Sequence, residues 1–179
     1  MLKKKYAIVT IICAIFFVLL WGMIFGFSAQ TGTQSGGLSD KIAEVAADIL
    51  DKLFSWEIAP ERLAFPIRKM AHMTEYALLW LDSYWMIYFM RRYREVTMQK
   101  EKDSRKKFPE SGSLWISVSM AFLTAVSDEI HQLFVPDRVG SIVDVGWDML
   151  GVTICIGIAW CCSCWQQYRR KKKKGVSPC

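Results

Sequence analysis

Hydrophobic residues form one uninterrupted run near the N-terminus. Residues 6–27 carry no charged side chain, and about 20 apolar helical residues suffice to cross the roughly 30 Å hydrocarbon core of a bilayer. The basic start at residues 3–5 and the small pair Ser28-Ala29 after the run resemble a secretory signal. The run is longer than the usual core of a signal and contains the bulky Trp21. We therefore expect it to remain as a membrane span.

Three later segments combine apolar stretches with isolated ionisable residues, and we expect each to form a further span. They cover residues 70–90, 114–135 and 141–165 approximately. The interrupting residues are His72, Glu75 and Asp82 in the second span, Asp128, Glu129 and His131 in the third, and Asp144 and Asp148 in the fourth. The pattern predicts an all-α integral membrane bundle of four transmembrane helices. Residues 1–165 would form a single membrane domain, followed by a basic tail at 166–179.

The distribution of charge predicts the orientation of these spans. Residues 91–110 contain eight Lys or Arg, whereas residues 28–67 contain three, against six acids. Basic connections stay on the cytoplasmic side of a bacterial inner membrane. We therefore expect both termini and the loop at 91–110 to be cytoplasmic, and the loop at 28–67 to lie outside.

The outer loop also carries a helical pattern. After a linker of Thr, Gly, Gln and Ser residues at 31–37, either Ser39 or Asp40 can act as an N-cap. Apolar residues then recur at helical spacing: Ile42, Val45, Ala46, Ile49, Leu50, Leu53 and Phe54. We expect an extracytoplasmic amphipathic helix over the outer face, as a lid that shields the mouth of the bundle or as a surface that recognises an external ligand.

Composition supports the membrane assignment and narrows the partners. With 179 residues, 53% hydrophobic content and eight tryptophans, the chain has room for one domain and is too apolar for an ordinary soluble one. The net charge of +6 comes from separate basic clusters rather than from a continuous basic face. This distribution favours membrane lipids as partners and argues against nucleic acid.

Cysteine and motif patterns give no indication of a cofactor. None of the six cysteines falls in a segment expected outside, where a disulfide could form. The pair Cys161 and Cys164 has the spacing of half a zinc site but lacks a second pair of ligands. Neither a Walker A loop, a nucleophile elbow nor an HExxH helix occurs. We expect no cofactor and no resident metal.

Polar residues from three spans fall at one level near the outer end of the predicted bundle. They are Arg68, His72 and Glu75 at the start of the second span, Asp128, Glu129, His131 and Gln132 in the last turns of the third, and Arg138, Asp144 and Asp148 at the start of the fourth. The first set shares one helix face, and the two carboxylates of the fourth span lie one turn apart. We expect all three sets to converge.

Energetics explain why these groups should face one another or water. An ionisable residue near the bilayer centre costs at least about 2.5 kcal/mol, and less towards the interface. Arg68 and Arg138 can pair with the carboxylates, and histidines can donate to them or take up protons. The alternative is an ion-pair cluster that only fixes helix packing. Asp82 lies deeper, and it either pairs with a polar neighbour or extends the polar track.

Several motifs occur in the order found in one family. They are Phe27-Ser28-Ala29-Gln30, Arg68-Lys69-Met70-Ala71-His72-x-x-Glu75-Tyr76, Ser127-Asp128-Glu129-Ile130-His131-Gln132, Pro136-x-Arg138 and Asp144-Val145. Over roughly residues 6–160 the chain resembles the VanZ-like family. The final block of that family commonly has Asn where this chain has Asp148, while Asp144 and Gly151 fit it. The resemblance implies a bacterial membrane protein, and the best-known relatives lower susceptibility to teicoplanin-type glycopeptide antibiotics.

Two kinds of function fit the polar layer. The first is non-enzymatic: an outward-facing pocket binds a lipid-linked cell-wall precursor or a lipoglycopeptide, with the arginines and histidines holding an anionic group. The residues expected in that pocket are Ser28, Gln30, Arg68, His72, Glu75, Asp128, Glu129, His131, Gln132, Arg138, Asp144 and Asp148.

The second is a membrane hydrolase or transferase acting on a lipid-linked phosphate or ester. Its candidate catalytic residues are His72, Glu75, Asp128, Glu129, His131 and Asp144, whose N and O donors would also suit a divalent metal. Proton-coupled transport and a purely structural role are further alternatives. Because four spans are few for a carrier, transport would require a homo-oligomer.

Overall fold

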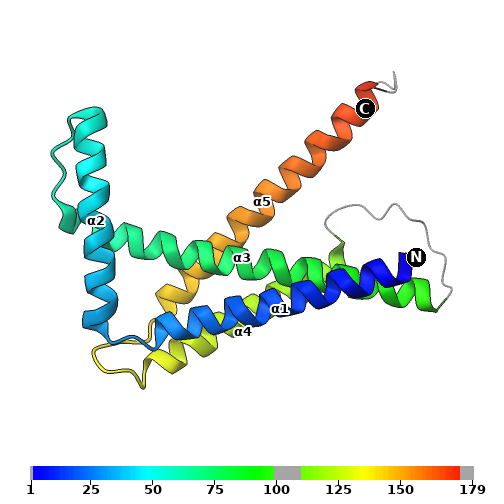
Figure 1. Ribbon diagram of the computed structural model, residues 1–179, viewed down its shortest axis with the longest axis horizontal. Helices are drawn as coiled ribbons and strands as arrows, with labels where there is room; N and C mark the ends of the chain where they lie inside the picture. Colours follow the sequence, from blue (N-terminus) through cyan, green and yellow to red (C-terminus); the bar gives the residue numbers. More distant parts are fainter. Residues whose placement is uncertain (1, 99–109, 174–179) are drawn as a thin grey trace.

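All secondary structure in the described part of the chain is helical. The computed structural model describes residues 2–98 and 110–173 (Figure 1). Within these ranges the helices are α1 (Leu2–Ser28), α2 (Gly32–Phe54), α3 (Pro60–Thr97), α4 (Ser111–Gln132) and α5 (Ile142–Lys173). The predicted all-α class is confirmed. Most of the expected cytoplasmic loop, residues 99–109, and the end of the basic tail, residues 174–179, lie outside the described residues.

Two helices of the described ranges are long and apolar enough to cross a membrane, namely Leu2–Ser28 and Ile142–Arg170. They indicate a membrane protein. Helices α3 and α4 contain serines and ionisable residues and are less apolar than these two helices. Length and composition alone therefore do not show four spans. The helices also extend past several expected bounds: α3 begins at Pro60, and α5 continues through Lys173 into the expected tail.

The outward surface of α1 is apolar along most of its length. Only Ile24 and Ser28 of this helix are buried. Large aliphatic side chains such as Ile11, Val18 and Leu19 are about three-fifths exposed in the isolated chain. A continuous apolar surface of this size on a long helix is explained by contact with lipid.

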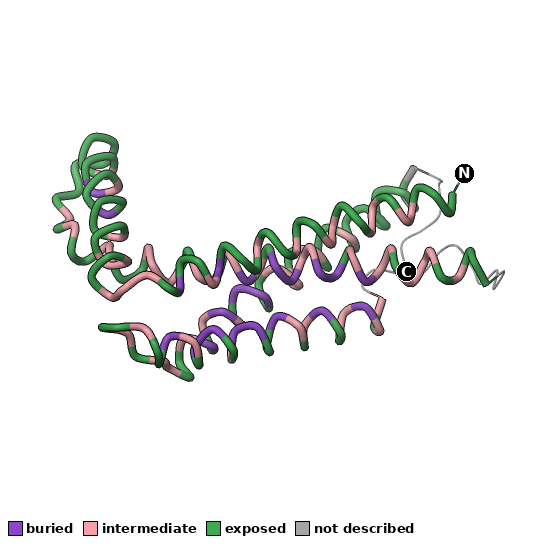
Figure 2. Tube along the Cα trace, turned by 60° about the horizontal axis from the view of Figure 1, so that its bottom comes forward, coloured by how far each residue is buried: buried purple, intermediate pink, exposed green. Residues whose placement is uncertain are grey.

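Helix α3 is the centre of the arrangement and packs against every other helix. Helices α1 and α4 run alongside it, α5 crosses it obliquely, and α2 lies crosswise at the end where α1 stops and α3 starts (Figure 1). Buried positions follow the inside of this bundle, whereas α2 and the outer faces of the long helices are mostly exposed (Figure 2).

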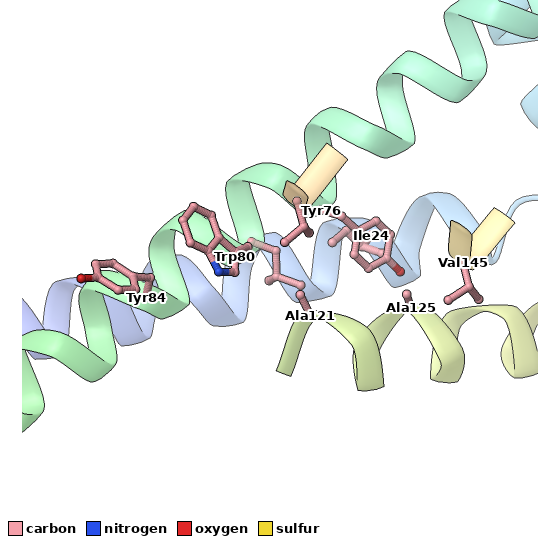
Figure 3. Close-up of a cluster of buried hydrophobic side chains, with 9 residues drawn as sticks. Ile24, Tyr76, Trp80, Tyr84, Ala121, Ala125 and Val145 are labelled. Atoms are coloured by element: carbon pink, nitrogen blue, oxygen red, sulfur yellow. The ribbon is translucent and has the colours of Figure 1, made fainter. Parts of the chain in front are cut away.

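The core joins large aromatic side chains of α3 to small residues of α4. Tyr76, Trp80 and Tyr84 project from α3 and are fully buried (Figure 3). The residues of α4 that are buried at every fourth position are Ser113, Ser117, Ala121 and Ala125. Small side chains let another helix approach closely, so the rings fill the space that they leave. The same face of α4 ends in the buried polar residues Asp128, Glu129 and Gln132.

Helix α5 touches the main chain of α3 at Gly151. A Cβ atom at this position would lie 2.2 Å from the carbonyl oxygen of Met73, a contact that real side chains do not make. Glycine is therefore required for the approach. Since Asp148 and Asp144 lie one and two turns before Gly151, the approach brings both carboxyl groups to α3.

Helix α2 starts earlier than the sequence predicted. Its N-cap is Thr31, whose hydroxyl accepts a hydrogen bond from the Gln34 backbone N–H, while the Gln34 side chain accepts one from the Thr31 N–H, each at 3.3 Å. The expectation of a cap at Ser39 or Asp40 is wrong, because this reciprocal capping box starts the helix within the expected linker. The helix ends at Ser55, which adopts a left-handed conformation with φ 54°.

Candidate functional site

Four of the polar residues of α4 and α5 that the sequence assigned to one layer are buried in the bundle, whereas His131 and Asp144 are partly exposed. Asp128 is 0% exposed and Asp148 1%, and Gln132 and Glu129 are buried with them. None of the four points into lipid. The Gln132 amide donates to Asp128 Oδ2 at 3.1 Å and to Glu129 Oε1 at 3.4 Å, so one side chain links two carboxyl groups. Ser28, at the end of α1, lies beside Asp128.

His72 brings α3 into this layer. Its Nδ1 atom lies 4.0 Å from Oε2 of Glu75 and 4.0 Å from Oδ1 of Asp148. These separations are too long for hydrogen bonds, so the imidazole faces two carboxyl groups without being locked to either. Neither oxygen of Asp148 has a hydrogen-bond partner in the described part of the chain. His72, Glu75 and Asp148 thus retain free bonding capacity.

Other members of the predicted set have structural partners. Glu129 Oε2 accepts a hydrogen bond of 2.7 Å from the backbone N–H of Ser141, immediately before α5. A carboxylate at a helix N-terminus satisfies a free N–H group and complements the helix dipole. Glu129 is therefore the residue that ties the end of α4 to the start of α5.

Arg138 caps the C-terminal end of α1. Its Nε donates to the carbonyl oxygen of Gln30 at 3.1 Å, and one terminal nitrogen donates to that of Phe27 at 3.4 Å. Both carbonyls lie at the C-terminal end of α1, where a cation is favourable, and that of Phe27 also accepts a hydrogen bond from the Gln30 backbone N–H at 3.2 Å. Gln30 accordingly contributes its main chain to this contact.

Two residues of the layer were not assigned a role from the sequence. Lys69 donates to Asp144 Oδ1 at 2.5 Å and joins α3 to α5 by an ion pair. The buried hydroxyl of Tyr76 has no hydrogen-bond partner in the described residues and interacts electrostatically with the carboxyl groups around it. Tyr76 could have been found by spacing, because it continues the row of Arg68 and His72 every four residues.

His131 and Asp82 lie apart from the open part of the site. The ring of His131 packs against Phe25 of α1, with ring centres 5.7 Å apart. Asp82 lies deeper, beside the thiol of Cys13 on α1. It has the polar neighbour that one of the two sequence interpretations expected.

A cavity of about 180 Å³ opens beside the layer, between α1, α2, α3 and the connection from α4 to α5. Its polar walls come from Gln30, Ser35, Ser39, Arg68, His72, Glu75 and Arg138, and its apolar walls from Phe27, Leu38, Ile42, Ile67 and Ala71. Arg68 Nε and Arg138 Nη1 are buried without hydrogen-bond partners in the described chain. Two guanidinium groups in the wall of this cavity therefore have N–H donors available for a ligand.

Electrostatics reinforce the attraction of this cavity for an anion. Burial lowers the pKa of Arg138 from its ordinary value, and the neighbouring Arg68 lowers it further, although nearby carboxyl groups act in the opposite direction. Arginine keeps its charge through such shifts. Two like charges held side by side favour an anion between them.

The sequence profile of the VanZ/LLP1 family matches residues 13–163, which is most of the chain. The chain belongs to the VanZ/LLP1 family. No curated protein and no solved structure matches it. The motifs that carried the family resemblance lie at the end of α1, on α3, α4 and α5, and in the connection between α4 and α5 of this VanZ/LLP1 protein. Within residues 2–98 and 110–173, no three His, Cys, Asp or Glu side chains are grouped closely enough to hold a metal ion.

Proposed function

We propose that this VanZ/LLP1 protein binds the anionic group of an envelope amphiphile, either a lipid-linked cell-wall precursor or a lipoglycopeptide. In doing so it lowers susceptibility to teicoplanin-type antibiotics. One observation carries the proposal: Arg68 Nε and Arg138 Nη1 are buried at a shared cavity and have no hydrogen-bond partner among the described residues. Unpaired buried donors are costly, so an acceptor that enters this cavity gains strong charge-assisted hydrogen bonds.

The surroundings of the two arginines also suit an anion. Arg138 is fixed by its bonds to the end of α1, so its remaining nitrogen is held in place before a ligand arrives. Guanidinium groups match the geometry of phosphate and carboxylate oxygens. His72, whose Nδ1 lies 4.0 Å from both Glu75 Oε2 and Asp148 Oδ1, can supply a further donor to the same ligand.

The proposal includes four spans, an outward-facing site and cytoplasmic termini. It is supported by the charge distribution of the loops and by the inward orientation of the ionisable residues on α4 and α5. Reporter fusions test it: alkaline phosphatase inserted after Ser55 should be active, and a fluorescent protein fused after residue 179 should fluoresce. Inactive phosphatase at Ser55 in a stably expressed fusion would contradict the orientation.

Binding by the purified protein tests the site directly. In detergent, the unsubstituted chain should bind a polyprenyl phosphate, and Arg68→Ala should weaken binding at least about tenfold, since a charge-assisted hydrogen bond contributes about 1.5–3 kcal/mol. Arg68→Lys should recover part of the loss. Arg94→Ala, an exposed arginine near the other end of α3, is the matched control and should bind normally. Equal binding by Arg68→Ala and Arg94→Ala would exclude the site.

A second function is favoured by the position of His72 between two carboxyl groups. An imidazole 4.0 Å from both Glu75 and Asp148 is placed for general acid and base work on a lipid-linked phosphate or ester. Release of inorganic phosphate or alcohol from such a lipid, abolished by His72→Ala while binding persists, would establish an enzyme. Binding without any turnover supports the first proposal instead.

A further inference from the structure

The apolar side of α2 is largely unpartnered by protein. Only Ala43 and Ala47 of this helix are buried. The larger apolar residues form a row along a neighbouring side and are between 48% and 68% exposed: Leu38, Ile42, Val45, Ile49 and Leu53. At 1.5 Å per residue this row is roughly 22 Å long. The small residues of α2 therefore make its protein contact, and the large ones remain free.

The apolar row of α2 begins in the cavity that is lined by Arg68 and Arg138. Leu38 and Ile42 belong to it, and both line the cavity opposite Ala71 and Glu75 of α3. Those residues lie further along α3 than its start beside α2. The apolar row of α2 therefore faces the part of α3 that leads into the core of the bundle.

Beyond the cavity the row leaves the bundle. The second half of α2 extends past α3 in both views of the molecule (Figures 1 and 2). Because α2 lies crosswise to α1, a membrane crossed by α1 has the second half of α2 lying along its outer surface. Val45, Ile49 and Leu53 then face the outer leaflet.

The positions of the charged residues around α2 are consistent with an apolar row that faces the outer leaflet. At 3.6 residues per turn, Lys41 and Lys52 fall along one edge of the apolar row, where a long basic side chain can extend to lipid phosphates, and Lys52 pairs with Asp48 at 2.6 Å. Three of the four acids of α2 fall further round and line a separate crevice beside the connection to α3, namely Glu44, Asp48 and Asp51, and Asp40 falls on the same side of the helix. The acidic side is thus turned away from the row.

We propose that the row on α2 holds the apolar chain of the same amphiphile whose anionic group lies between Arg68 and Arg138. The ligand then enters sideways from the outer leaflet, with Leu38 and Ile42 at the junction of head group and chain. This inference rests on the proposed function. It adds that the protein recognises the apolar chain of the ligand as well as its charge, and that this apolar chain binds to α2.

Chain length and a double substitution test the inference together. The full-length protein in one detergent is given two probes, dimethylallyl phosphate and a long-chain polyprenyl phosphate. Val45→Ser combined with Ile49→Ser should weaken binding of the long probe about tenfold and leave the short probe unchanged, because only the long chain reaches these residues. The matched control is Ile142→Ser with Val143→Ser, an exposed pair at the start of α5 outside the cavity. It should bind both probes normally.

The outcomes separate the two proposals. If the unsubstituted protein binds neither probe, the proposed function is overturned. Normal binding of the long probe by the α2 double variant overturns the chain site while the anion site stands, and bulk lipid is then the partner of the row. Loss of the short probe in that variant also overturns the chain site, because the row would then be supporting the head-group pocket itself.

Discussion

Gly151 of α5 lies against the main chain of Met73 of α3, close enough that a Cβ atom would be 2.2 Å from the Met73 carbonyl oxygen. This contact sets the separation of the two helices that carry His72 and Asp148. The geometry of the polar layer thus depends on a residue that has no polar atoms in its side chain.

Replacing Gly151 by alanine should destabilise the protein by about 1–3 kcal/mol, because the added methyl group forces α5 away from α3. The measurement is the midpoint of thermal unfolding in detergent. Gly157→Ala is the control on the same helix, since a Cβ there meets nothing within 4 Å. Alanine at that position should be neutral or stabilising by up to about 1 kcal/mol. Equal effects at both positions would contradict the close packing.

The two carboxylates of α5 should respond differently to amide substitution. Asp144→Asn weakens the ion pair with Lys69, which is mostly enclosed, and should cost about 1–3 kcal/mol. Asp148→Asn should leave stability unchanged or raise it, because a neutral amide is less costly to bury than a carboxylate that accepts no hydrogen bond from any described residue. Unfolding midpoints of the two variants give the comparison. A greater loss in Asp148→Asn would show that Asp148 has a strong partner.

Arg138 should have a structural effect as well as an effect on binding. Arg138→Ala removes the donors to the carbonyl oxygens of Phe27 and Gln30, so the end of α1 should exchange its amide hydrogens faster and unfolding should become easier by about 1–3 kcal/mol. Arg68→Ala, which removes no hydrogen bond to the carbonyl oxygens at the end of α1, is the comparison variant. Amide exchange monitored over residues 24–34 distinguishes them. Unchanged exchange in Arg138→Ala would contradict the capping role.

Antibiotic susceptibility should follow the cavity rather than the whole polar layer. In cells that depend on this protein for reduced teicoplanin susceptibility, Arg68→Ala and His72→Ala should restore susceptibility at normal protein abundance. His131→Ala should leave it near the unsubstituted level, because that ring packs on Phe25 away from the cavity. Measuring drug susceptibility and protein level together separates a lost site from a lost fold. Equal loss at all three positions with normal abundance would argue against the cavity as the working site.

Some of the candidate site could be predicted from spacing. Arg68, His72 and Glu75 fall on one face of an apolar helix, and the structure places all three in the wall of one cavity. The roles of Lys69 and Tyr76 were missed, since a basic residue near a span end and a tyrosine in a span have several ordinary explanations. The early start of α2 was missed because its glycines suggested a linker, whereas the Thr31 capping box outweighs their low helix propensity.

The sequence by itself determined that this protein is helical and apolar, and it indicated that charged groups must turn away from lipid. Those properties follow from local periodicity and from the cost of burying charge in hydrocarbon. Only the tertiary structure decided which partners the charged groups take: Glu129 holds the start of α5, Lys69 holds Asp144, and Asp148 has no hydrogen-bond partner within the described part of the chain. Partner choice depends on the rotation and separation of packed helices, and contacts such as that of Gly151 with Met73 fix these over long distances in the chain.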